Sequence, residues 1–450
     1  MTKLEFESLD DLTNMEMECI CGEVHRVGIR RILIEEKALY QVFSIIRDLD
    51  LLGKALLVAD RNTYAAAGRE LEEELIRHGL EIKSCILLDD GQELHADEKA
   101  LGSVLVHLEE DTRLLIAVGS GTLNDIVRYM SYRMGIPYIV VATAPSMDGY
   151  ASTVSPLVVN GFKKTFSATY PVAIVGDVDI LRQAPMETIQ AGLGDVLGKM
   201  TSLSDWLLGY RVNGEYYCPL IVGTMQRAAE KCIQNVEGLS RREGRAIKEL
   251  MEGLILAGIT MQMAGNSRPA SGSEHHLSHY WEMQHLMEKR RTPLHGIKVG
   301  VATLLIHKMY DRILKMEAHR LHAAEKTPED IEEWKRDIKR CFGPLADEVF
   351  RQKEATHIPH GELEEKIRRL ATVWPQVKEE IKELLSLVAN VRELLQKIGA
   401  PSTPAELGVS LDRLYDALRY AKEVRDRYTV LQLADQLGVL DSIAKEIVNE

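Results

Sequence analysis

The strongest constraint on the fold of this chain is the alternation of short apolar runs with helical patterns between about residues 50 and 180. The runs LLIAV at 114–118 and YIVVA at 138–142 are continuously apolar, which is typical of strands buried on both faces. Amphipathic segments, such as 64–78 and 123–134, separate the runs. This order predicts parallel strands joined by helical crossovers. We therefore predict an α/β domain with a doubly wound parallel sheet over residues 1–182.

The remainder of the chain has a different periodicity. Beyond about residue 183, apolar residues recur at helical spacing almost to the end, with glycine, proline and asparagine as interruptions. The region 310–390 is dense in charge, as expected for the solvated faces of long helices. The sequence therefore predicts an all-α second domain over residues 183–450.

Charge and cysteine content limit the partners and the location. The chain has 55 Lys and Arg against 68 Asp and Glu, a net charge of −13, whereas a general nucleic-acid binder needs a basic face. Its six cysteines lack the dense spacing of a disulfide framework. No window approaches the roughly 18 apolar residues of a membrane span. We expect a cytoplasmic protein without a nucleic-acid partner and without membrane insertion.

A glycine loop follows the apolar run at 114–118. In the sequence GSGTLND, which begins at Gly119, glycines would let the backbone approach a pyrophosphate, and the start of the next helix would offer N–H groups to it. Many α/β turns need glycine for steric reasons alone, and the third glycine of the usual dinucleotide fingerprint is missing.

Two other strand ends add candidates. Asp60 could bind ribose hydroxyls, or it could cap the following helix. The segment TAPSMDGYAS, which begins at Thr143, could line a nicotinamide pocket, with Asp148 binding substrate hydroxyls, although helix capping would also explain these residues. The predicted dinucleotide-binding residues are Asp60, Gly119, Gly121, Thr122, Leu123, Asn124, Asp125, Thr143, Ala144, Pro145, Ser146 and Ser152.

Candidate metal ligands lie in the helical half. Five of the 14 histidines fall between 275 and 295, and His275 and His279 share one helix face at i and i+4 spacing. His295 offers a third imidazole, and Asp195 lies among glycines that would allow close approach. One carboxylate and two imidazoles with open positions are typical of a catalytic divalent site. Cys19, Cys21 and His25 also resemble metal ligands, but without a second cysteine pair we do not expect zinc there.

Six motifs in one order resemble a known family. The blocks GSGTLND at 119, TAPSMDGYAS at 143, PVAIVGD at 171, AGLGDVLGK at 191, SGSEHHLSH at 271 and LHGIKVG at 294 resemble those of the sn-glycerol-1-phosphate dehydrogenases. That family belongs to the superfamily of metal-dependent polyol dehydrogenases and 3-dehydroquinate synthase. The segment RDRYT at 425–429 resembles the bacterial branch of the family.

The resemblance implies an activity and a set of roles. We expect NAD(H)-dependent interconversion of dihydroxyacetone phosphate and sn-glycerol 1-phosphate by hydride transfer at C2, in a homodimer. The resemblance implies that Asp195, His275 and His295 hold one divalent metal ion, Zn²⁺ or Ni²⁺. It also implies that Asp148, Asp195 and His279 contact the substrate, with Asp195 and His279 catalytic.

Other interpretations stay open. A dehydrogenase of the same scaffold could act on a non-phosphorylated polyol such as glycerol. A cyclase similar to 3-dehydroquinate synthase and a catalytically silent nucleotide-binding protein are further alternatives. The basic residues that would bind a substrate phosphate are also unassigned, and the candidates near the motifs are Lys163, Lys164, Lys199 and Lys298.

Overall fold

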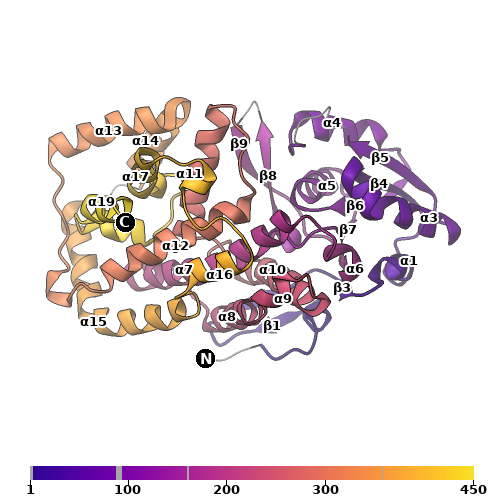
Figure 1. Ribbon diagram of the computed structural model, residues 1–450, viewed down its shortest axis with the longest axis horizontal. Helices are drawn as coiled ribbons and strands as arrows, with labels where there is room; N and C mark the ends of the chain where they lie inside the picture. Colours follow the sequence, from indigo (N-terminus) through magenta and orange to yellow (C-terminus); the bar gives the residue numbers. More distant parts are fainter. Residues whose placement is uncertain (1–3, 88–93, 160–161, 357) are drawn as a thin grey trace. The chain divides into compact units, whose positions relative to one another are not determined.

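The computed structural model describes residues 4–87, 94–159, 162–356 and 358–450 (Figure 1). The chain packs into two compact units, the first formed by residues 1–196 and 223–266 and the second by 197–222 and 267–450. Helix α7 (Met186–Asn213) continues from the first unit into the second, and α8 (Pro219–Gln234) returns to the first. The sequence ranges 1–182 and 183–450 stay our prediction for the domains.

The first unit is built on a six-stranded parallel sheet. The strand order is β3-β10-β7-β6-β4-β5, and Figure 1 shows the strands with helices beside them. The strands are β3 (Arg31–Glu35), β4 (Lys54–Asp60), β5 (Ile82–Leu87), β6 (Thr112–Gly119), β7 (Tyr138–Ala142) and β10 (Ala173–Asp177). The predicted α/β sheet is therefore confirmed.

Burial on both faces explains the continuous apolar runs. Alternate residues of β4, including Leu57, pack with α1 (Val42–Asp48) and α3 (Arg69–Arg77) in one apolar cluster. The intervening residues Leu56 and Val58 are buried as well. At about 25 cal/mol for each Å² of apolar surface removed from water, such strands supply much of the stability of this unit.

Further elements complete the first unit. They are two antiparallel hairpins, β1 (Glu16–Glu18) with β2 (Val24–Arg26) and β8 (Val154–Val159) with β9 (Phe162–Ser167), and the helical elements η1 (Leu9–Leu12), η2 (Ala38–Gln41), α2 (Arg61–Thr63), η3 (Tyr64–Gly68), α4 (Glu98–His107), α5 (Gly121–Met134), η4 (Gly149–Ala151), α6 (Val178–Leu181), α9 (Val236–Ser240) and α10 (Gly244–Ala264). Helix α10 packs against η4, β2 and β3. Residues 223–266 thus belong to the same packed body as the sheet.

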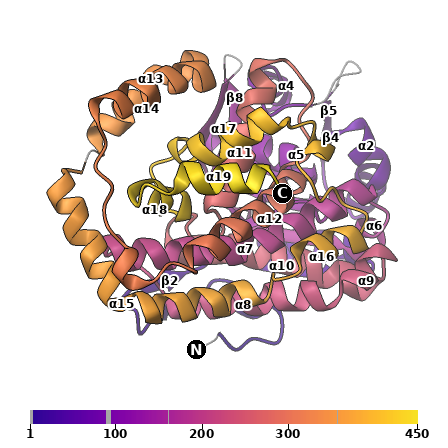
Figure 2. The ribbon, with the colours of Figure 1, turned by 60° about the vertical axis from the view of Figure 1, so that its left-hand side comes forward.

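In the described residues of the second unit, every regular element is a helix. Figure 2 shows several of them, with α13 and α14 at the upper left. After the end of α7 and the start of α8, they are α11 (Ser273–Met287), α12 (His295–Ile313), η5 (Ala318–Arg320), α13 (Pro328–Phe342), η6 (Gly343–Leu345), α14 (Ala346–Ala355), α15 (His360–Ser386), α16 (Val391–Lys397), η7 (Ala405–Leu407), α17 (Leu411–Tyr420), η8 (Ala421–Glu423), α18 (Val430–Gln436) and α19 (Leu440–Val448). The predicted helical second part is therefore confirmed. Within the described ranges, no helix has the length and apolar content that crossing a membrane requires.

Candidate dinucleotide and metal sites

Three of the predicted positions meet at one edge of the sheet. Strand β6 lies between β4 and β7, and the register pairs Val58 with Ala117 and Gly119 with Ala142. Asp60, Gly119 and Thr143 therefore lie at the carboxyl ends of three neighbouring strands. The strand order also reverses here: β5 lies on one side of β4, and the next strand, β6, lies on the other side. Open α/β sheets bind ligands in the crevice at such a reversal.

The glycine loop leads into helix α5, and the space beside Gly121 is open. A Cβ atom added at Gly121 would touch only Met147, at 3.5 Å, and the preceding Ser120 makes no side-chain cap. The first N–H groups of a helix have no partner within the helix, and they attract anions. The loop therefore has the backbone donors and the open approach that a pyrophosphate needs.

Some predicted cofactor residues have structural partners. Asp60 caps α2, since its Oδ1 accepts a hydrogen bond from Thr63 N at 2.8 Å. The buried Asn124 side chain accepts from the Tyr138 hydroxyl at 3.2 Å. Asp125 pairs with Arg128 at 2.8 Å. These contacts within the protein support the glycine loop and its neighbouring strand ends.

Arg128 was missed by the sequence analysis. It is fully buried, and it donates to the carbonyl oxygens of Val154 at 3.0 Å, Tyr150 at 3.3 Å and Gly149. One guanidinium thus fixes the segment 149–154, which contains the predicted Ser152. Its position one turn after Asp125 on α5 was the available signal, since i,i+3 pairs share a helix face.

The loop from Thr143 to Ser152 packs closely on α7. A Cβ atom at Gly192 would overlap the carbonyl oxygen of Pro145, so only glycine allows this approach. Three residues further along α7, the fully buried Asp195 accepts a hydrogen bond at Oδ2 from Asp148 N, at 2.9 Å. The structure therefore brings the predicted residues Asp148 and Asp195 together.

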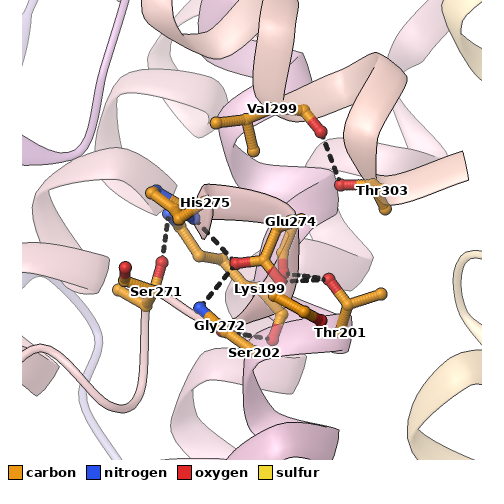
Figure 3. Close-up of polar contacts among 12 residues, drawn as sticks. Lys199, Thr201, Ser202, Ser271, Gly272, Glu274, His275, Val299 and Thr303 are labelled. Carbon is orange, nitrogen blue, oxygen red and sulfur yellow. Dashed lines mark hydrogen bonds and ion pairs between the residues drawn. The ribbon is translucent and has the colours of Figure 1, made fainter. Parts of the chain in front are cut away.

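The first predicted histidine ligand is oriented by its neighbour. Figure 3 shows the buried Glu274 carboxylate among His275, Gly272 and Thr201. Oε1 lies 2.7 Å from His275 Nδ1 and 2.7 Å from Gly272 N, and Oε2 accepts from the Thr201 hydroxyl at 2.7 Å. Burial alone would raise the pKa of Glu274, but these hydrogen bonds hold it below its usual value. A carboxylate that accepts from Nδ1–H leaves Nε2 of the imidazole available to a metal.

Three imidazoles converge in the second unit. His295 lies at the start of α12. Its ring centroid is 5.1 Å from the ring centroid of His275 and 5.4 Å from that of His279. His279, Glu282 and His295 also offer ligand atoms within 4.8 Å of one another. Burial, and then the nearby Arg425, hold the pKa of His279 well below its usual value, so this imidazole is neutral at neutral pH. Neutral imidazoles with carboxylates are a donor set that suits Zn²⁺ or Ni²⁺.

Two arginines lie beside the histidines. Arg425 Nη2 is 3.3 Å from His279 Nε2, and its Nη1 is 3.4 Å from the Ser271 hydroxyl. Arg427 donates to the Ser271 carbonyl at 3.0 Å and to the Ser267 hydroxyl at 2.6 Å. No carboxylate of the described residues forms an ion pair with either guanidinium. Burial, and then Arg425 and Arg268, lower the pKa of Arg427 to about 10.

The lysine candidates differ in their surroundings. Lys199 is fully buried and donates to Ala270 O at 3.1 Å, and Lys298 donates to the Thr292 hydroxyl at 3.0 Å. Lys164 is exposed on β9, and the side chain of Lys163 lies outside the described residues. The sequence analysis missed Arg425 and Arg427 as phosphate candidates, although it singled out the segment that carries them.

Comparison with known proteins identifies the fold. Residues 33–185 match the family model described as iron-containing alcohol dehydrogenase. An alcohol dehydrogenase from Oenococcus oeni has a TM-score of 0.60 at 13% identity, over 92% of this chain and 98% of that one. A glycerol dehydrogenase from Schizosaccharomyces pombe has a TM-score of 0.57 at 17% identity, over 93% and 90%. The fold is thus that of the iron-containing alcohol dehydrogenases.

Curated relatives narrow the class. A glycerol-1-phosphate dehydrogenase (NAD(P)+) from Geobacillus thermodenitrificans is 32% identical over 97% of this chain and 99% of its own length. Proteins of the same name from Halalkalibacterium halodurans and Bacillus subtilis are each 33% identical, over 92% and 94% and over 85% and 85% of the two chains. The chain belongs to the glycerol-1-phosphate dehydrogenase family.

Proposed function

We propose that this protein interconverts dihydroxyacetone phosphate and sn-glycerol 1-phosphate, with NAD(H) and a divalent metal ion. The observation that carries this substrate assignment is Arg425. Its guanidinium lies beside His279, without an ion-pair partner among the described carboxylates. The nearby Glu282 only partly offsets the burial of this cation, so a bound phosphate would recover free energy that burial costs. An unphosphorylated polyol would not supply this additional negative charge.

The dinucleotide is proposed to bind at the carboxyl edge of the sheet. The N–H groups at the start of α5 would hold the pyrophosphate, and the loop from Thr143 to Ser152 would hold the nicotinamide end. Asp60 would reach the ribose with the oxygen that does not cap α2. A carboxylate at this place repels a 2′-phosphate, so we propose a preference for NAD over NADP.

The metal ion is proposed to bind Asp195, His275 and His295. Helix α7 carries Asp195 and, less than two turns later, Thr201, whose hydroxyl binds the carboxylate that orients His275. When bound, the ion would polarise the C2 carbonyl of the ketone or lower the pKa of the C2 alcohol. Zn²⁺ and Ni²⁺ both accept these donors.

His279 and Asp148 are proposed to contact the substrate. Glu282 Oε2 lies 3.5 Å from His279 Nδ1, which favours the tautomer with the proton on Nδ1. Nε2 is then an acceptor, and Arg425 faces it. A neutral imidazole held in this tautomer can accept a hydroxyl proton from the substrate. Asp148 lies on the loop whose backbone binds Asp195.

The substrate assignment is tested with metal-reconstituted protein. We expect NADH oxidation with dihydroxyacetone phosphate to exceed that with dihydroxyacetone by about a hundredfold or more in kcat/KM, with sn-glycerol 1-phosphate as the product enantiomer. A preference for dihydroxyacetone would favour a polyol dehydrogenase of the same scaffold and would overturn the assignment.

Location and assembly complete the proposal. We propose a cytoplasmic location, which fits the six free cysteines, and a homodimer, as the family resemblance implies. Light scattering of the purified protein would give its oligomeric state, and a monomeric mass would contradict the dimer.

A further inference from the structure

The β1–β2 hairpin carries a cluster of metal-type donors. Cys19 and Cys21 lie in the turn after β1, and His25 lies on β2, where it pairs with Met17. The turn is closed by hydrogen bonds from Gly22 N to Cys19 O at 2.9 Å and from Cys19 N to Glu23 O at 3.0 Å. The two thiols and the imidazole each offer a ligand atom within 4.8 Å of the others.

The orientation of His25 is that of a metal ligand. Its ring is fully buried, and Nδ1 lies 2.8 Å from the carbonyl oxygen of Met263 in α10. A carbonyl can only accept, so Nδ1 carries the proton. Nε2 therefore presents its lone pair, and it lies 3.5 Å from Cys21 Sγ. A metal-binding histidine typically donates its other ring N–H to a carbonyl or carboxylate, which fixes the tautomer and the ring.

The other cysteines differ in their surroundings. Cys85 donates to the Ser103 carbonyl at 3.8 Å, and Cys232 donates to the Glu249 carbonyl at 3.4 Å. Cys341 lies in α13. Unlike these buried cysteines, Cys19 and Cys21 are only partly buried, and they lie in one turn beside His25 on the adjacent strand.

We propose that Cys19, Cys21 and His25 bind a structural Zn²⁺ ion. Thiolates and imidazoles are the usual ligands of structural zinc, and binding would release the thiol protons. Such an ion would join the hairpin to the last turn of α10, through His25 and its bond to Met263. The sequence did not favour this site because its thiols are not arranged as two pairs.

Metal spectroscopy tests the proposal independently of activity. Protein reconstituted with Co²⁺ should show sulfur-to-cobalt charge-transfer absorption in the near ultraviolet. The histidines and carboxylate proposed for the catalytic metal contain no sulfur, so they cannot produce this band. X-ray absorption of the zinc-loaded parent should show sulfur neighbours at about 2.3 Å, because the donors proposed for the catalytic ion supply only nitrogen and oxygen. This measurement needs no variant and is unaffected by misfolding of a mutant.

Two variants locate the site. Cys21→Ser should remove the charge-transfer band and lower the metal content by about one ion per chain, while the control Cys85→Ser keeps both. Absence of the band in the parent, its retention in Cys21→Ser, or a Cys19–Cys21 disulfide in the parent would each overturn the proposal.

Discussion

The two units differ in how their polar groups are arranged. At the sheet edge of the first unit, the glycine loop offers backbone N–H groups, and Arg128 is paired with Asp125 and with carbonyl oxygens. The second unit buries more charged side chains around the candidate metal ligands, among them Glu274, Lys199 and Lys298. If both proposed sites hold, a chain with a net charge of −13 would bind anions in two ways, by backbone dipoles and by buried cations with a metal.

The two arrangements should respond differently to change. Backbone donors do not titrate and cannot be removed by side-chain substitution. Buried ionic groups are costly when a partner is lost, because the remaining charge stays out of water. Variants of the second unit should therefore have larger effects than variants of the glycine loop.

The largest effect is expected for His275→Ala. Loss of a metal ligand should lower kcat/KM by about a thousandfold or more and remove the bound catalytic metal. NADH affinity should stay at the parent value, because the proposed nucleotide-binding residues belong to the first unit. Metal analysis and fluorescence titration with NADH measure these quantities, with the exposed His319→Ala as a control. Metal content equal to that of the parent would refute the assignment of His275.

The next largest effect is the contribution of Asp205 to the pH dependence of the free energy of unfolding. Burial, and then repulsion from Glu274, raise the pKa of this carboxyl from 3.8 to about 6. Between these values the folded chain binds more protons than the unfolded chain, so the contribution of Asp205 to stability is present below about pH 4 and lost as the pH rises to about 6. The expected loss is roughly 1.4 kcal/mol for each pH unit, or about 3 kcal/mol in total.

Denaturant unfolding of the parent and of Asp205→Asn from pH 4 to 7 measures this effect. The variant does not titrate at this position, so the parent should lose stability relative to it as the pH rises. The carboxylate also accepts hydrogen bonds from Tyr310 and from Val430 N, each at 2.7 Å, so the variant should start from a lower stability with the slope unchanged. A pH-independent difference would contradict the raised pKa.

A smaller effect is expected for Arg425→Gln. Removing the cation should raise KM for dihydroxyacetone phosphate by about thirtyfold, or about 2 kcal/mol, since hydrogen bonds to charged groups contribute about that much. Turnover of dihydroxyacetone should be unchanged, because that ketone has no phosphate to bind. Steady-state kinetics with both ketones separates the two cases. An equal loss with both substrates would assign Arg425 to positioning His279 instead.

The smallest effect is expected in the first unit, for Gly121→Ala. The added methyl meets only Met147 within the protein, so the free energy of unfolding should stay constant or rise by up to about 1 kcal/mol. The methyl would lie where the pyrophosphate approaches, so the Kd for NADH should rise about tenfold. Gly102→Ala in α4 is the matched control, because its added Cβ also has open space. Unchanged NADH affinity in Gly121→Ala would place the pyrophosphate elsewhere.

Local periodicity made the sheet and the helical half predictable from the sequence. The apolar runs gave β6 and β7, and the i,i+4 spacing placed His275 and His279 on one face of α11. The partners of these residues were not predictable, because they depend on contacts distant in sequence. Thr201 is far from Glu274 along the chain, and Arg425 is far from His279. Likewise, nothing in the helical pattern of 223–266 shows that it packs with the sheet.

The donors of the hairpin illustrate the same limit. Cys19 and Cys21 are visible as a close pair, but the hydrogen bond that orients His25 comes from Met263, 238 residues away. A short sequence motif therefore reveals only part of a site whose supporting groups come from another part of the chain.

The first unit is formed from two separate segments of the chain, which affects the order in which it is synthesised. Its sheet is complete in sequence at Asp177, but α10, which packs on η4, β2 and β3, ends only at Ala264. The residues of α7 that belong to the second unit are therefore synthesised before the first unit is complete. Since each unit is formed from two separate segments, neither can be cut out of the gene as one continuous segment.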